Sequence, residues 1–125
     1  MQLAKAYNRL GAAADASATA LLAVRRHPSS PAAFNGAGWL LALEGRAHEA
    51  VEVLRRGRRL HPRDPHIPFH LGKAYADLGQ PARAAAALRA ARRLDPASAE
   101  AALLLGLALF DGADGSALRP AYHMF

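Results

Sequence analysis

The chain has 125 residues, a length that corresponds to a single domain or one short array of repeats. Its hydrophobic fraction of 52% and its charged fraction of 21% are those of ordinary globular proteins, and they exclude a wholly disordered chain. The absence of cysteine excludes disulfides, thiol nucleophiles and zinc sites built on thiolates, whereas the net charge of +6 is compatible with an acidic protein, nucleic acid or an anionic membrane as partner.

No membrane-spanning segment is visible in the sequence. The longest apolar run covers residues 101–110, which is about half the length that a transmembrane helix needs. Residues 10–24 loosely resemble the core of a signal peptide, but Asp15 interrupts them and small polar residues are frequent there. The simplest expectation is therefore a soluble cytoplasmic protein.

The strongest signal in the chain is an internal repeat of 34 residues. Proline, glycine and small or branched apolar residues recur at this spacing, and we call each set of positions 34 residues apart a column. The clearest columns are Pro28, Pro62 and Pro96; Gly11, Gly45 and Gly79; Gly38, Gly72 and Gly106; Ala16, Ala50 and Ala84; and Ala20, Leu54 and Leu88. A repeat of this length predicts stacked supersecondary units.

Taken in chain order, residues 1–30 form only part of a unit, and residues 31–64 form the first complete one. In this complete unit a helix is expected over residues 34–44, with Gly45 as its stop. A second helix is expected over residues 47–60.

The unit over residues 65–98 shows the same plan most clearly. Its first helix, over residues 66–78, has apolar residues at helical spacing and is followed by Gly79, a typical helix stop. Pro81 suits the first turn of the second helix, and Asp95-Pro96 closes the unit, since proline cannot continue a helix.

The last segment, residues 99–125, departs from this plan. A first helix is expected over residues 99–111, followed by a loop over residues 111–115. Residues 116–125 are expected either to form a short capping helix or to extend away and insert into another subunit. These boundaries divide a single domain into a partial repeat, two complete repeats and a C-terminal helix with an atypical tail.

The columns also predict how the helices pack. Small residues such as Gly38, Gly72 and Gly106 let a partner helix approach closely. Because one helix pair cannot bury both of its faces, successive units must stack to form a core. Larger side chains are expected to fill the remaining gaps, namely Tyr7, Leu41, Leu54, Leu60, Tyr75, Leu88 and Leu94.

On these residues the chain resembles the tetratricopeptide repeat family. The resemblance rests on Leu71-Gly72, Tyr75, Gly79, Ala84, Leu88, Ala91 and Pro96, with Gly38, Gly45, Ala50, Leu54 and Pro62 matching one unit earlier. It implies an all-α fold, a right-handed α-solenoid of antiparallel helix pairs with about three to three and a half repeats. Members of this family are usually non-catalytic scaffolds, and their first helices line a concave groove that often binds an extended peptide or a helix.

By that resemblance, the candidate residues of the partner-binding groove are Lys5, Asn8, Asn35, Trp39, His66, Phe69, His70 and Lys73. Trp39 has the rigid ring of a typical binding anchor, although packing between neighbouring first helices would also explain it. Lys73, one turn after Phe69, favours an acidic or C-terminal peptide segment, and the alternative is a solvated side chain. The clamp of Lys, Asn and Arg with which some family members hold chaperone tails is not intact, because Gly36 stands where Asn is expected.

No cofactor, metal or catalytic site is expected. His66 and His70 lie one helical turn apart, a spacing that can hold a metal, but no cysteine or obvious carboxylate completes the set. Phosphate-binding loops, nucleophile elbows and paired carboxylates with histidine are also missing from the sequence. We therefore expect a protein without enzymatic activity.

The helix over residues 99–111 is apolar on nearly all sides, so it is expected to be covered. The cover is either the chain's own tail, a second copy of the chain or a different protein. The candidate residues of this end face are Leu103, Leu104, Leu107, Phe110, Tyr122 and Phe125.

Arginines cluster late in the second helices, where repetition is expected to stack them into a stripe. Such a stripe is either a solvated surface that suits the helix dipole or a site that attracts phosphate or an acidic protein. Nucleic acid is not expected, since no nucleic-acid motif and no interleaved aromatic residues accompany the stripe. Its members are Arg25, Arg26, Arg55, Arg56, Arg58, Arg59, Arg89, Arg92 and Arg93.

The sequence therefore predicts a non-catalytic adaptor that binds a peptide or helix of another protein in its groove. One alternative is a structural subunit that its end face holds in a larger complex. The other is a protein that binds anionic surfaces through the arginine stripe.

Overall fold

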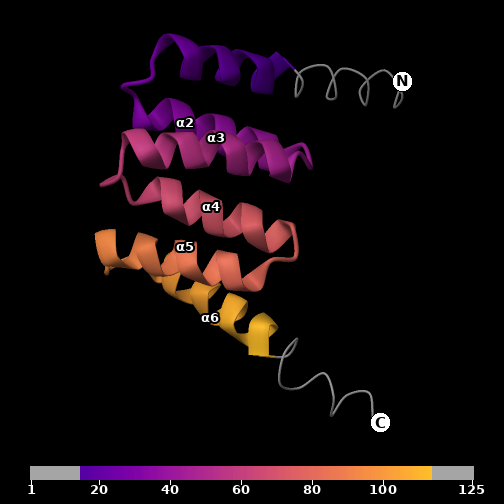
Figure 1. The fold of residues 1–125 in the computed structure, drawn as a ribbon, viewed down its shortest axis with the longest axis vertical. Helices are drawn as coiled ribbons and strands as arrows, with labels where there is room; N and C mark the ends of the chain where they lie inside the picture. Colours follow the sequence, from indigo (N-terminus) through magenta and orange to yellow (C-terminus); the bar gives the residue numbers. More distant parts are fainter. Residues whose placement is uncertain (1–14, 114–125) are drawn as a thin grey trace.

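The computed structural model describes residues 15–113, and every structural statement below concerns that part of the chain. Residues 15–26 are helical, and the helices that follow are α2 (Pro31–Leu43), α3 (Ala47–Leu60), α4 (His66–Asp77), α5 (Pro81–Leu94) and α6 (Ala99–Ala113). No strand occurs in residues 15–113. The helices follow one another in chain order along the long axis of the molecule, from the indigo helix over residues 15–26 to the orange and yellow α6 (Figure 1). The predicted all-α solenoid is confirmed.

From α2 onward, each helix packs against the helices before and after it in the chain. In addition, α2 touches α4, and α4 touches α6 less extensively. The first helices of successive units therefore lie side by side on one face of the stack, which we call the first-helix face.

Two predicted boundaries are wrong. Helix α2 begins at Pro31 and not at Phe34, because the side chain of Ser30 accepts a hydrogen bond from the amide of Ala33 and proline suits the first helical turn. Helix α6 continues to Ala113, so residues 111–113 are not part of the predicted loop.

The glycine stops after α2 and α4 are confirmed by their backbone conformation. Gly45 and Gly79 have positive φ values of 75° and 69°, a region that favours glycine. The turns close in the same way, since the amide of Arg46 donates to the carbonyl of Leu41 and the amide of Gln80 donates to that of Tyr75, both at 2.9 Å. Each turn sends the chain back antiparallel to the helix it has left.

Close approach at the glycine columns holds the two helices of a pair together. A Cβ atom at Gly38 would lie 2.5 Å from Cγ of Leu54, and one at Gly72 would lie 2.5 Å from Cγ of Leu88. A side chain at either position would therefore force the pair apart. The expected close packing is confirmed for these two glycines, whereas no described side chain lies within 4 Å of such an atom at Gly106.

The core runs along the contacts between successive helices in two clusters. The larger cluster joins the helix over residues 15–26 to α2, α3, α4 and α5, and the smaller one joins α5 to α6. The completely buried large side chains include Phe34, Leu41, Leu54 and Ile67. Two of the side chains predicted to fill gaps are instead largely exposed: Leu60 by 55% and Leu94 by 40%, because each is the last residue of its helix. A third, Tyr7, lies outside the described residues.

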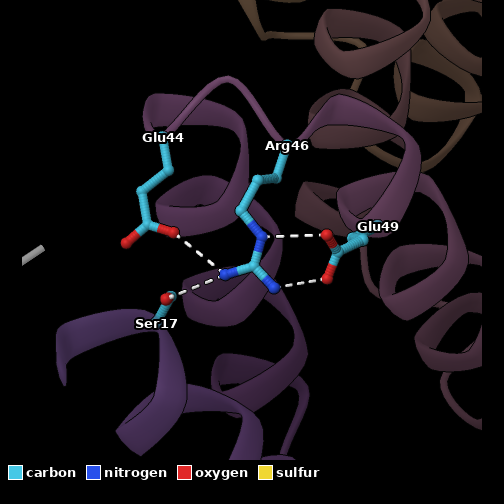
Figure 2. Close-up of polar contacts among 4 residues, drawn as sticks. All are labelled: Ser17, Glu44, Arg46 and Glu49. Carbon is cyan, nitrogen blue, oxygen red and sulfur yellow. Dashed lines mark hydrogen bonds and ion pairs between the residues drawn. The ribbon is translucent and has the colours of Figure 1, made fainter. Parts of the chain in front are cut away.

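Arg46 ties the first described helix to the turn between α2 and α3 (Figure 2). Its Nη1 atom donates to Oε2 of Glu44 at 3.2 Å and to Oγ of the buried Ser17 at 3.3 Å. Its Nε and Nη2 atoms both donate to the carboxylate of Glu49, and this hydrogen bonding lowers the pKa of that carboxyl. No helix in residues 15–113 has the length and apolar character needed to cross a membrane.

Candidate functional site

Two hollows open on the first-helix face, on either side of α4. The smaller one has a volume of about 90 Å³, lies between α2 and α4, and is lined by Gly38, Trp39, Ala42, Leu43, His70, Lys73 and Asp77. The larger one has a volume of about 810 Å³ and lies between α4, the start of α5 and α6. We call them the α2–α4 hollow and the α4–α6 hollow. Lys73 lines both of them and therefore stands on the ridge between them.

The α4–α6 hollow is mostly apolar with a charged rim. Its apolar lining includes Leu104 and Leu107 from α6, and its charged rim holds Lys73, Arg83 and Asp111. A cleft with apolar walls and a few polar groups at its edge is the usual form of a site that accepts an apolar side chain. This hollow can therefore take a leucine-sized or larger anchor from a partner.

Trp39 projects from α2 beside the smaller hollow. The side chain remains 47% exposed, so packing against neighbouring helices uses only part of the ring. The adjacent Leu43 is also exposed. An exposed aromatic ring beside an exposed leucine offers apolar area that a partner can cover at little entropic cost.

Three of the predicted groove residues form one group on α4. The Nζ atom of Lys73 lies 5.7 Å from the ring centroid of Phe69, within the range of a cation–π contact. The rings of Phe69 and His70 meet edge to face with centroids 5.5 Å apart. Burial lowers the pKa of His70, and the positive charges of Lys73 and His66 lower it further. The imidazole of His70 is therefore neutral at pH 7, and Lys73 is the cation of this group.

Asn35, another predicted groove residue, forms hydrogen bonds between helices. Its Nδ2 atom donates to the carbonyl of Pro31 at 3.1 Å and to Oδ1 of Asp64 at 3.3 Å. The same Asp64 oxygen accepts from the amides of His66 and Ile67 at the start of α4, at 2.8 and 3.2 Å. These bonds connect α2 to the N-terminus of α4, so Asn35 contributes to the stack and does not line either hollow.

The other predicted residues are placed as follows. His66 is exposed at the start of α4 and shares a hollow of about 200 Å³ with Phe69, the end of α5 and the start of α6. Leu103 and Phe110 on α6 are 66% and 63% exposed. Lys5, Asn8, Tyr122 and Phe125 lie outside the described residues.

The α4–α6 hollow thus brings together residues from the predicted groove and the predicted end face. Leu104 and Leu107, which the sequence suggested both for the groove and for the end face, line the same hollow as Lys73. Asp77, which the resemblance also places on the groove side, lines the α2–α4 hollow, whereas Leu43 was not predicted. Trp39, Lys73 and Leu107 share one column of the repeat, and Leu43, Asp77 and Asp111 share the next. The repeat therefore indicates Leu43 as a further residue of this face.

Residues 15–113 lack a cluster of metal-binding side chains, but they expose many arginines. Residues 15–113 contain no group of three or more His, Asp or Glu side chains placed to hold a metal ion, so His66 and His70 are only a pair. Every arginine of the predicted stripe is exposed. Arg89, Arg92 and Arg93 line a shallow hollow of about 350 Å³ with Leu105.

Several solved structures share this fold. The type III secretion chaperone SycD of Yersinia enterocolitica, in complex with a peptide of the translocator YopD, has a TM-score of 0.71 at 19% identity, over 89% of this chain and 90% of that one. PcrH in complex with the chaperone binding region of PopD has a TM-score of 0.65 at 21% identity, over 86% and 80% of the two chains. Identities this low establish the fold alone.

Sequence models give the family. Two models, both described as tetratricopeptide repeat, match residues 1–65 and 41–108. No curated protein matches the chain significantly in sequence. Each of the two models spans more than half of the chain, and the glycine stops and glycine-packed helix pairs agree with them. The chain belongs to the tetratricopeptide repeat family.

Proposed function

We propose that the protein is a non-catalytic interaction module that binds an extended peptide segment of a partner protein across the first-helix face. The observation that carries the proposal is the pair of hollows on either side of Lys73. Two structural neighbours, SycD and PcrH, are described as complexes with a peptide of YopD and with the chaperone binding region of PopD, which supports a peptide as the class of ligand.

The geometry suggests the spacing of the anchors. Neighbouring packed helices lie about 8–10 Å apart, and a peptide in the extended polyproline II conformation advances about 3.1 Å per residue and presents every third side chain on the same side. Two apolar side chains about three residues apart would then enter the two hollows. The larger side chain would enter the α4–α6 hollow, and the smaller would cover Trp39 and Leu43.

Charge suggests what lies between the anchors. Lys73 is the cation that lines both hollows, so one carboxylate of the peptide, placed between the anchors, can face it. Asp77 lines the α2–α4 hollow and Asp111 lines the α4–α6 hollow, where they would repel further acidic residues of the peptide. The proposed ligand is therefore an apolar peptide with a single acidic residue between its anchors, and not a polyacidic tail.

The test selects binders from a random peptide library on the full chain. We expect the selected sequences to share two large apolar residues about three positions apart, with Asp or Glu between them. Because Trp39 is the only tryptophan, its emission reports binding directly and should shift to shorter wavelength as the ring is covered.

Matched variants decide whether the proposed face is used. Lys73→Glu should weaken binding of an acidic-centred peptide about tenfold or more and should favour the same peptide with Lys at its centre. Arg59→Glu, an equal change of charge on an exposed residue of α3, is the control and should have little effect. If the selected peptides bound the Lys73→Glu and Trp39→Ala variants as tightly as the unsubstituted chain, the proposal would be contradicted.

A second candidate function is supported by the exposure of Leu103 and Phe110 on α6. This apolar surface suits a structural subunit of a larger complex, held through α6. The expected result is then a stable assembly in native lysate that Phe110→Glu disrupts and Lys73→Glu leaves intact. The opposite pattern would favour the peptide-binding module.

A further inference from the structure

A glycine on a first helix leaves a gap, which we call a notch, because it has no side chain. One notch of the array has no occupant among the described residues. In the two complete pairs, the notch at Gly38 holds Leu54 and the notch at Gly72 holds Leu88, in each case a residue 16 positions later. Gly106 continues the same column on α6, and no described atom lies within 4 Å of a Cβ built there. The notch on α6 is therefore formed but not filled by residues 15–113.

The side chain next to this notch is also less covered than its equivalents. Leu41 on α2 is completely buried, and Tyr75 on α4 is half-buried. Leu109, the third member of this column, is 44% exposed. The buried side of α6 is the one that faces α5, through Ala101, Leu105 and Ala108. The face of α6 that would meet a second helix in a complete pair is thus apolar and uncovered by the described residues.

The repeat register identifies a segment that fits this face. The buried positions of α5 that include Ala84, Leu88 and Ala91 correspond, 34 residues later, to Leu118, Ala121, Tyr122 and Phe125. All four are apolar, and Tyr122 falls at the position of Leu54 and Leu88. Arg119 is the exception, because it falls at the buried position of Ala85.

We propose that residues 114–125 pack against the uncovered face of α6, with Tyr122 in the notch at Gly106. Pro120 falls at the position of Ala86 inside α5, and proline is tolerated only in the first turn of a helix, so the register argument applies to residues from 120 onward, which include Tyr122. The segment directly follows α6, and the short connection makes its effective concentration far higher than that of a second copy or another protein. Gly106 and Leu109 do not line the α4–α6 hollow, so this contact is independent of the proposed peptide site.

Glycine substitutions in the full chain provide the first test. Gly36→Ala, in open space on α2, should raise the melting temperature by a few degrees through helix propensity. Gly106→Ala should instead lower it, and this loss should disappear when Tyr122→Ala is also present. A rise on Gly106→Ala, equal with and without Tyr122→Ala, would overturn the proposal.

Disulfide trapping provides a direct measure of the contact, because the natural chain has no cysteine. The doubly substituted chain Gly106→Cys with Tyr122→Cys should form an intramolecular bond under mild oxidation. Gly36→Cys with Tyr122→Cys is the negative control, and Gly72→Cys with Leu88→Cys calibrates the yield for a notch that is filled. Mainly intermolecular disulfides would show that a second copy covers this face, and they would overturn the proposal. The proposal would also be overturned if the Gly106→Cys with Tyr122→Cys chain formed no disulfide while the calibrating pair did.

Discussion

The helix pair α2–α3 and the helix α6 carry the same columns of residues, but they bury them to different extents. Gly38 and Leu41 of α2 are covered by α3, whereas Gly106 and Leu109 in the same columns of α6 have no described helix over them. A repeat motif therefore specifies which faces can pack, while the neighbouring helix decides which of them are buried.

The largest difference in the free energy of unfolding is expected between a buried leucine of α2 and an exposed leucine of α6. Leu41→Ala removes a completely buried side chain of α2 and should lower the free energy of unfolding by about 2–5 kcal/mol. Leu103→Ala, at a 66% exposed position of α6, should change it by no more than about 0.5 kcal/mol. Urea unfolding of both variants measures the contrast. Equal losses would mean that Leu103 is covered in solution, and the comparison would break.

The second prediction concerns two glycines in helices of the same type. Gly72→Ala places a methyl group against Leu88 and should cost about 1–3 kcal/mol through overpacking. Gly36→Ala adds the same group in open space and should stabilise the protein by about 0.5–1 kcal/mol. The opposite signs are measured by thermal or urea unfolding. Stabilisation by both substitutions would show that the helix pairs are looser than described.

The third prediction concerns the hydrogen bonds that join α2 to α4. Asp64→Ala removes an acceptor for two amides at the start of α4 and for the side chain of Asn35. The expected loss is about 0.5–2 kcal/mol, as for other helix caps. Asp64→Asn keeps a side-chain acceptor and should recover most of that loss. If Asp64→Asn is as unstable as Asp64→Ala, the capping role is wrong.

The smallest effect should come from protonation of His70. Because its pKa in the folded protein lies below the ordinary value of 6.5, the unfolded chain binds the proton more readily. Its contribution to stability should be complete above pH 6.5 and should be lost as the pH falls through the lowered pKa. His70→Gln should flatten the fall of the melting temperature between about pH 7 and pH 5. An unchanged slope would mean that His70 is solvated in the groove, and would remove it from the group with Phe69 and Lys73.

The fold was largely predictable because its main signals are local. Gly45 and Gly79 end helices by adopting positive φ, a conformation that depends on the residue itself and its turn. The columns of Gly38 and Gly72 similarly indicated which faces come together. The start of α2 was misplaced because the Ser30 cap was overlooked in favour of the first large apolar residue.

The face proposed to bind a peptide was less predictable because it depends on contacts between helices distant in sequence. Trp39 and Lys73 line one hollow because α2 and α4 lie side by side. Leu104 joins Lys73 because α6 packs beside α4. Asn35 was expected in the groove by its position on α2, but a hydrogen bond to Asp64, 29 residues away, gives it a different role. Such pairings follow only when the helices are stacked.

By itself, the sequence determined the repeat length, the helix pairs, the glycine stops and the family. These features arise from backbone preferences and from periodic apolar faces, which act within one unit and recur in the next. Only the tertiary structure decided which leucines are buried, and where the hollows beside Lys73 open. Burial and cavities are properties of two or more helices together, so identical columns on α2 and α6 have different surroundings.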